Sequence, residues 1–188
     1  MKIKIRRVTS WIRVVNAARF TVNKCPIDHE PLDEFKEKLI RSEHSPLRLL
    51  EYDIQMYKVP YWIVMHLVRH HVGVQPFVST QRPDRTGGAS RHDLPQDALV
   101  NVQLSINAQA ILNISRLRLC ENAAYETKKL WRAVILELKN IDPILAKYCV
   151  PQCTFKGFCS EFNSCGKSKL VIEANHLNLI NNDSDRNN

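Results

Sequence analysis

The segment from Leu50 to Tyr57 alternates between apolar and polar side chains, and this pattern constrains the fold more than any other. The apolar positions are Leu50, Tyr52, Ile54 and Met56, and they alternate with Glu51, Asp53, Gln55 and Tyr57. Because successive side chains of a strand point to opposite faces, alternation of this kind is typical of a half-buried strand. The sequence therefore predicts a strand here with one apolar and one polar face.

Segments with helical character lie on both sides of this strand. Asp142 followed by Pro143 gives an N-cap and a proline in the first turn of a short helix. The other expected elements are an edge or first strand over 3–8 and helices over 10–19 with Ser10 as N-cap, 33–41, 61–70, 96–117 and 122–139. The residues alone therefore show a mixture of α and β elements.

The 188 residues are 44% hydrophobic and 24% charged, which favours one compact domain that needs no disulfide or metal to fold. No apolar stretch approaches the roughly 20 residues needed to cross a bilayer, and the first residues lack the pattern of a secretion signal. We therefore expect a cytoplasmic protein with no membrane partner. The boundaries we expect are a main domain over 1–145, a Cys-rich extension over 146–170 and a disordered tail over 171–188.

The chain carries 27 Lys and Arg residues against 19 Asp and Glu, a net charge of +8, which favours anionic ligands. Nucleotides, phosphorylated cofactors and nucleic acid all qualify. Residues 72–95 are broken by Gly and Pro and contain Arg82, Arg85 and Arg91, so we interpret them as a loop. Three arginines in such a loop suit a phosphate, although a solvated basic loop would have the same composition.

Arg69, His70 and His71 precede this loop, and Ser79 follows His71 after seven residues. Two imidazoles and a guanidinium at a helix C-terminus also fit a simple cap that complements the helix dipole. However, the segment resembles the signature of flavin-dependent thymidylate synthase, ThyX, in which Arg-His-Arg is followed by seven residues and Ser.

Other motifs of that family recur in the same order, over roughly residues 10–140. Upstream, Ala17-Ala18-Arg19-Phe20-Thr21 is similar to an early Ala-Ala-Arg segment, and His44-Ser45-Pro46 to a His/Ser/Thr-Pro element. Downstream, Arg91 with Leu94-Pro95 resembles the family's Arg followed by Leu-Pro. Asn107-Ala108-Gln109 with Asn113 is similar to its Asn-Ala-Arg with a later Asn, and Leu117-Arg118 is similar to its Asn-Leu-Arg.

The resemblance implies an α+β fold with an antiparallel sheet flanked by helices, and a homotetramer whose sites combine several subunits. It implies reductive methylation of the nucleotide dUMP to dTMP with FAD, methylenetetrahydrofolate and NADPH, in which the flavin performs the redox chemistry. The implied catalytic residue is Arg118, which would polarise the uracil ring. The implied dUMP ligands are His66, Arg69, Ser79, Thr80, Arg82, Arg91 and Arg118, and the implied FAD ligands are Thr21, His44, Ser45, Arg69, His70, His71, Asn107, Gln109 and Asn113.

The sequence departs from the family pattern at several positions. The expected Arg two residues after the signature Ser is Gln81, so either Ser79 keeps its role with a shifted arginine, or Thr80 and Arg82 take the two positions. We prefer the second, because Thr-Gln-Arg restores the hydroxyl-x-Arg spacing. The remaining departures are His71 for Arg, Phe77 or Val78 for a Glu, Gln109 for Arg, and Asn122 for a His.

These departures keep three alternatives open. The first is a homologue that acts on another pyrimidine nucleotide or forms a hydroxymethyl product. The second is a protein that binds the nucleotide or FAD without turnover. The third is a basic nucleic-acid-binding module, which is disfavoured because the arginines share one loop and no stacking aromatics accompany them.

Four cysteines, Cys149, Cys153, Cys159 and Cys165, fall within seventeen residues outside the ThyX resemblance. Four thiolates can hold a tetrahedral zinc ion or an iron–sulfur cluster, but these spacings lack the paired Cys-x-x-Cys. Structural or redox thiols and disulfides are the alternatives. Cys25 and Cys120 are interpreted as structural cysteines.

Overall fold

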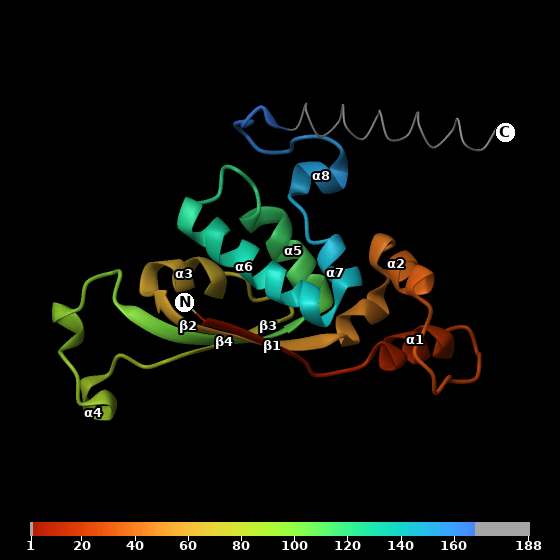
Figure 1. The fold of residues 1–188 in the computed structure, drawn as a ribbon, viewed down its shortest axis with the longest axis horizontal. Helices are drawn as coiled ribbons and strands as arrows, with labels where there is room; N and C mark the ends of the chain where they lie inside the picture. The colour runs from red at the N-terminus through yellow and green to blue at the C-terminus, as the bar shows by residue number, and fades with distance from the viewer. Residues whose placement is uncertain (1, 168–188) are drawn as a thin grey trace.

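The computed structural model describes residues 2–167, in which one sheet carries helices on one of its faces (Figure 1). The tail expected over 171–188 and the last three residues of the Cys-rich extension lie outside the described residues. The strands are β1 (Lys2–Arg7), β2 (Glu51–Pro60), β3 (Val74–Val78) and β4 (Leu99–Asn107). The helices are α1 (Trp11–Phe20), α2 (Asp33–Arg41), η1 (Ser45–Leu49), α3 (Tyr61–Val68), α4 (Pro83–Thr86), η2 (Arg91–Asp93), α5 (Ala108–Arg118), α6 (Tyr125–Ile141), α7 (Pro143–Lys147) and α8 (Gln152–Lys156).

The four strands are ordered β1-β2-β4-β3, and every neighbouring pair is antiparallel. The central strands β2 and β4 place Ile54 opposite Leu104. The register shifts between Met56 and Val59, where Lys58 has a φ of 56°. This arrangement confirms the α+β class and the antiparallel sheet expected from the sequence.

Two expectations were wrong. The segment 96–117 is not one helix, because Leu99–Asn107 forms strand β4 and only the second half, from Ala108, is helical. Alternate side chains of β4 are buried, so its apolar period is that of a strand although no breaker interrupts it. The loop 72–95 also contains strand β3, which pairs with β4 through residues that include Pro76.

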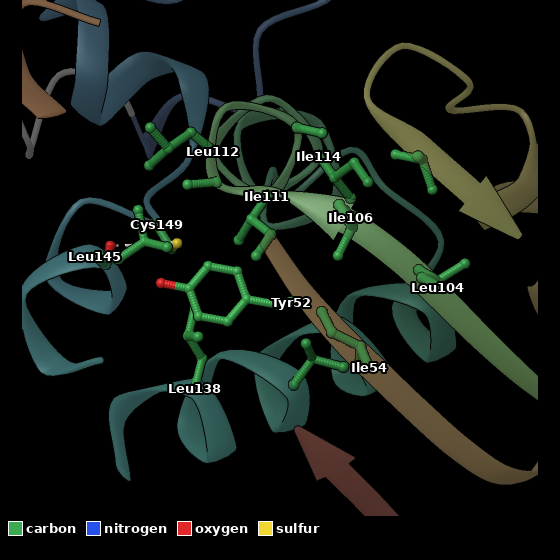
Figure 2. Close-up of a cluster of buried hydrophobic side chains, with 14 of the residues drawn as sticks. Tyr52, Ile54, Leu104, Ile106, Ile111, Leu112, Ile114, Leu138, Leu145 and Cys149 are labelled. Carbon is green, nitrogen blue, oxygen red and sulfur yellow. Dashed lines mark hydrogen bonds between the residues drawn. The ribbon is translucent and has the colours of Figure 1, made fainter. Parts of the chain in front are cut away.

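The helices enclose the core between themselves and the sheet. Figure 2 shows Tyr52 and Ile54 from β2 and Leu104 and Ile106 from β4 facing Ile111 and Ile114 of α5, with Leu138 of α6 on the other side of Tyr52. Each of these side chains is at most 2% exposed. Burial of this kind, roughly 25 cal/mol for each Å² of apolar surface, is the main force that holds the helices on the sheet.

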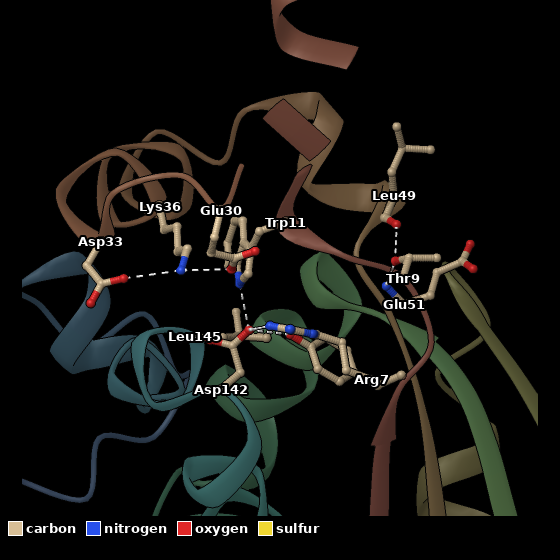
Figure 3. A network of polar contacts seen from close by, with 11 residues as sticks. Arg7, Thr9, Trp11, Glu30, Asp33, Lys36, Leu49, Glu51, Asp142 and Leu145 are labelled. Atoms are coloured by element: carbon tan, nitrogen blue, oxygen red, sulfur yellow. Dashed lines mark hydrogen bonds and ion pairs between the residues drawn. The ribbon is translucent and has the colours of Figure 1, made fainter. Parts of the chain in front are cut away.

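A buried carboxylate at the junction of α6 and α7 contacts α1 and the sheet (Figure 3). Asp142 joins α6 to α7, and its side chain accepts hydrogen bonds from Trp11 Nε1 and Tyr52 Oη at 2.8 Å each and from the backbone N–H of Leu145 at 3.1 Å. The predicted N-cap is therefore confirmed. Arg7 lies 3.8 Å from the same carboxylate and supplies a compensating charge.

Within residues 2–167, no helix combines the length and apolar character required to cross a membrane.

Candidate functional site

Arg118, the last residue of α5, contacts the segment that follows α3. Its Nε donates to His70 Nε2 at 2.9 Å, and its Nη2 donates to the backbone carbonyl of His66, also at 2.9 Å. A guanidinium group has five N–H donors, so three remain for a ligand. These two contacts fix the plane of the guanidinium before any ligand arrives.

The charge around this contact is positive and uncompensated. Burial, together with the charges of Arg118, Arg69 and His71, lowers the pKa of His70 to about 4. His70 is therefore neutral at pH 7, and its Nε2 lone pair accepts the hydrogen bond from Arg118. Within residues 2–167 no carboxylate forms an ion pair with Arg69 or Arg118, so the cluster suits an electron-rich or anionic ligand.

Thr127 of α6 contacts His66, and the sequence analysis did not select it. Its hydroxyl lies 2.8 Å from His66 Nδ1, and Thr127 is fully buried. His66 is also in edge-to-face contact with Trp62, with ring centroids 5.6 Å apart. His66 is thus held by its side chain while its carbonyl holds Arg118.

Asn107, an expected FAD ligand, lies beside the turn that follows His71. Its backbone N–H donates to the Gly73 carbonyl at 3.0 Å, and its Oδ1 caps α5 by accepting from the N–H of Ala110 at 2.9 Å. Gly73 has a φ of +75°, and a Cβ there would lie 2.5 Å from Asn107 Nδ2. The signature segment and the start of α5 are therefore packed as closely as glycine permits.

Gln109 and Asn113 lie on one face of α5, beside the residue that precedes His44 and Ser45. Gln109 Nε2 donates to Glu43 Oε2 at 2.8 Å and lies 3.3 Å from Asn113 Oδ1. Arg116 forms an ion pair with the same Glu43 carboxylate. Glu43 thus links two motifs that we expect at the FAD site, although the sequence analysis did not select it.

The expected phosphate ligands form a separate group. Ser79 Oγ accepts from the backbone N–H of Asn101 at 2.9 Å, and Thr80 Oγ1 accepts from that of Arg82 at 3.2 Å. Arg82 donates to both carboxylate oxygens of Asp84, at 3.0 and 2.7 Å. Its guanidinium is therefore paired, a contact that the sequence analysis missed.

The structure does not bring all the expected residues together in one chain. Arg91 lies exposed in η2, and none of the side-chain hydrogen bonds within residues 2–167 joins the segment 79–93 to Arg69 or Arg118. Thr21 caps α1, which lies at the opposite end of the molecule from α4 along its longest axis (Figure 1). Three groups of residues are thus distinct surfaces of the chain. They are the Arg118 cluster (Arg118, His70, His66 and Arg69), the Glu43 cluster (Glu43, Gln109, Asn113 and Arg116) and the expected phosphate ligands in the segment 79–93.

The cysteines are arranged differently from the expectation. Cys149 is buried in the core near Tyr52 and donates its thiol to the Leu145 carbonyl at 3.5 Å (Figure 2). Cys153, Cys159 and Cys165 line a different pocket, together with Cys120. In the described part of the chain no three His, Cys, Asp or Glu side chains are placed to hold a metal ion, so Cys149, Cys153, Cys159 and Cys165 do not form one set of ligands, which the sequence had left open as one alternative.

Comparison with known proteins gives partial matches in sequence and a broad match in fold. No family model matches the sequence. The chain is 32% identical over 80 residues to a flavin-dependent thymidylate synthase of Clostridium tetani, a stretch that covers 42% of this chain and 32% of that protein. A flavin-dependent thymidylate synthase of Saccharolobus solfataricus is 33% identical over 64 residues, which cover 34% of this chain and 25% of the relative. The matches thus span a third or less of the length of these curated relatives.

Solved structures are similar over most of the chain. ThyX from Helicobacter pylori, in complex with FAD and dUMP, has a TM-score of 0.65 at 15% identity, covering 80% of this chain and 100% of that one. The UMP/dUMP methylase PolB from Streptomyces cacaoi, bound with 5-Br dUMP, has a TM-score of 0.59 at 16% identity, covering 84% of this chain and 96% of that one. The ThyX-like fold expected from the motifs is therefore confirmed.

Proposed function

We propose that this chain, a divergent relative of the flavin-dependent thymidylate synthases, is a flavin-dependent enzyme that methylates C5 of a pyrimidine nucleotide, with dUMP as substrate and dTMP as product. The observation that carries the proposal is Arg118, a partly buried cation held in one orientation by His70 and the His66 carbonyl, with three donors left for a ligand. The solved ThyX structure in complex with FAD and dUMP supports the choice of ligands.

The residues beside this cluster suit a flavin. Asn107, Gln109 and Asn113 offer amide donors and acceptors for the carbonyl and imide groups of the ring, and Arg69 offers charge for a pyrophosphate. His44, Ser45, His70, His71 and Thr21 complete the proposed set. When bound, the flavin supplies the redox chemistry, and the protein supplies orientation and electrostatics.

Arg118 acts on the pyrimidine in this mechanism. Its free N–H groups donate to a ring carbonyl and stabilise the negative charge that forms as N3 loses its proton and C5 becomes nucleophilic. His70 has no proton on Nε2 at neutral pH, so it orients the guanidinium without adding a second charge. Arg69 and His66 are assigned to the same nucleotide by the resemblance to ThyX.

The phosphate is assigned to the segment 79–93. Arg91, which has no ion pair within residues 2–167, supplies one guanidinium, and Arg82 supplies a second after it exchanges Asp84 for the phosphate. The hydroxyls of Ser79 and Thr80 remain candidates for an additional hydrogen bond. We propose that a homotetramer brings this segment of one subunit to Arg118 of another, since no side-chain hydrogen bond or ion pair joins the two within residues 2–167. Methylenetetrahydrofolate and NADPH are the proposed co-substrates, in the cytoplasm.

The test is C5 exchange and product formation by the purified full chain with FAD, NADPH and methylenetetrahydrofolate. We expect release of tritium from dUMP labelled at C5, and dTMP identified by mass spectrometry. Arg118→Lys should lower the rate about 100-fold or more, the usual cost of losing an oriented charge donor. Arg13→Lys, at an exposed position of α1, is the matched control and should leave the rate unchanged. Binding of dUMP and FAD without tritium release would instead identify a non-catalytic nucleotide-binding protein.

One observation favours a second candidate, a different pyrimidine nucleotide or a hydroxymethyl product. Phe77 or Val78 takes the place of the family's Glu near the signature Ser, and both side chains are exposed, at 60% and 38%, so an apolar group replaces a charge beside the proposed phosphate segment. The similarity to a UMP/dUMP methylase also supports a wider range of bases and sugars. Competition among dUMP, UMP and dCMP, with each product weighed by mass spectrometry, separates the two candidates, and dTMP from dUMP alone would exclude the second.

A further inference from the structure

The C-terminal segment lies against the loop that follows Arg118. Asn122 Nδ2 donates to the backbone carbonyl of Asn163 at 2.6 Å, and Lys167 forms an ion pair with Glu121 at 3.1 Å. Lys128 of α6 pairs with the same glutamate at 2.8 Å. The extension is therefore anchored within four residues of Arg118.

Between the extension and this loop lies a pocket of about 140 Å³ that four cysteines line. Cys120 comes from the end of α5, and the other three, Cys153, Cys159 and Cys165, come from the extension. All four are free thiols; Cys120 is buried and Cys165 is exposed. Burial is the largest cause that raises the pKa of the Cys120 thiol, and the charges of Glu161, Cys165 and Cys153 add to the rise. Glu161, Cys165 and Cys153 line the same pocket as Cys120.

This arrangement suits chemistry between two thiols better than metal binding. Within residues 2–167 no three potential ligands are placed around one metal position. Two thiols that line one pocket can instead form a disulfide where their Cα atoms approach to about 4.4–6.8 Å, and an exposed thiol gives an oxidant access.

We propose that the pocket is a redox-sensitive clasp in which a disulfide between Cys120 and Cys165 fixes the extension to the end of α5. The oxidant is a low-molecular-weight disulfide such as oxidised glutathione. The exposed Cys165 thiolate attacks it, so one sulfur–sulfur bond breaks, a mixed disulfide forms and one glutathione leaves as the thiol. Cys120 then loses its proton and attacks the Cys165 sulfur, which releases the second glutathione. Two protein thiols are oxidised, and one glutathione disulfide is reduced to two thiols.

The clasp joins segments 45 residues apart in the chain, so it restricts the unfolded state far more than the folded one. It also tethers the residue two positions after Arg118. The inference does not depend on the proposed enzymatic activity, because its chemistry is confined to the extension and the loop.

The test uses the full chain equilibrated over a series of glutathione redox ratios, then alkylated and analysed by intact mass and peptide mapping. We expect the loss of two hydrogens, a cross-linked peptide that contains Cys120 and Cys165, and a rise of roughly 5–10 °C in the thermal midpoint, all reversed by dithiothreitol. Cys165→Ser, at an exposed position, should abolish all three effects without disturbing the fold.

Cys25→Ser is the matched control, because Cys25 is exposed and does not line the pocket. It should leave the cross-link and the thermal shift intact. An oxidised chain with no intramolecular disulfide, or one whose cross-link persists in Cys165→Ser, would overturn the proposal.

Discussion

Removal of Asp142 should destabilise the fold strongly, because three donors from separate elements depend on its carboxylate (Figure 3). In Asp142→Ala, the indole N–H of Trp11 and the hydroxyl of Tyr52 lose their acceptor. Both side chains are at most 1% exposed, so water cannot replace it. The backbone N–H of Leu145 also loses its cap.

The magnitude follows from these three losses. Each orphaned buried donor costs about 1–3 kcal/mol, and the lost N-cap about 1 kcal/mol. Removing the buried carboxylate recovers part of its desolvation cost, so we expect a net loss of about 3–5 kcal/mol in the free energy of unfolding. That is a large share of the roughly 5–15 kcal/mol that stabilises an ordinary domain.

Urea unfolding measures this loss as a lower midpoint at an unchanged slope. Asp142→Asn keeps one acceptor oxygen and should cost less than Asp142→Ala. Tyr52→Phe should add little to Asp142→Ala, because the hydroxyl has already lost its partner. Asp53→Ala, which removes a surface ion pair with Arg6, is the matched control and should cost under about 1 kcal/mol. An Asp142→Ala chain within 1 kcal/mol of the wild type would refute this account of the network.

Three further outcomes are expected. The pKa of His70 is about 4 in the folded chain, below the usual 6.5. Between pH 6.5 and pH 4 the unfolded chain therefore binds more protons than the folded chain, and the free energy of unfolding falls as the pH falls. His70→Gln should recover about 1 kcal/mol of that free energy at about pH 5 and little at about pH 7, measured by urea unfolding. Gly73→Ala should destabilise the chain by at least about 2 kcal/mol more than Gly87→Ala, since both glycines have positive φ but only Gly73 has a neighbouring side chain where the Cβ would lie. Asp84→Asn should release Arg82 and tighten dUMP binding two- to five-fold by calorimetry, about 1 kcal/mol at most, and unchanged affinity would remove Arg82 from the phosphate site.

Sequence patterns predicted the elements whose signals are local. The alternation over Leu50–Tyr57 identified β2, and the helix expected over 33–41 matches α2 at both ends. The error at 96–117 arose because a run without Gly or Pro was interpreted as helical although its first half has the period of a strand. Asn107 lies where the period changes from strand to helix, and there it caps α5.

The contacts around the candidate site could not be predicted in this way. Thr127 and His66 are 61 residues apart, and Gln109 and Glu43 are 66 apart. No local pattern relates residues at such separations, because the folded core decides which helix faces meet. The motifs nevertheless selected one member of each pair, so the expected residues were useful starting points for finding their partners.

The departures from the ThyX pattern are accompanied by contacts specific to this chain. Asn122, in the place of a histidine, binds the Cys-rich extension through the Asn163 carbonyl. Gln109, in the place of an arginine, donates to Glu43, whose charge is already balanced by Arg116. An arginine at position 109 would give this carboxylate a second cation in a partly buried place, and a histidine at position 122 would change the amide contact that anchors the extension. Each altered residue therefore makes a contact that the family residue would disturb, and restoring the family residues singly should weaken these contacts rather than rebuild a ThyX site.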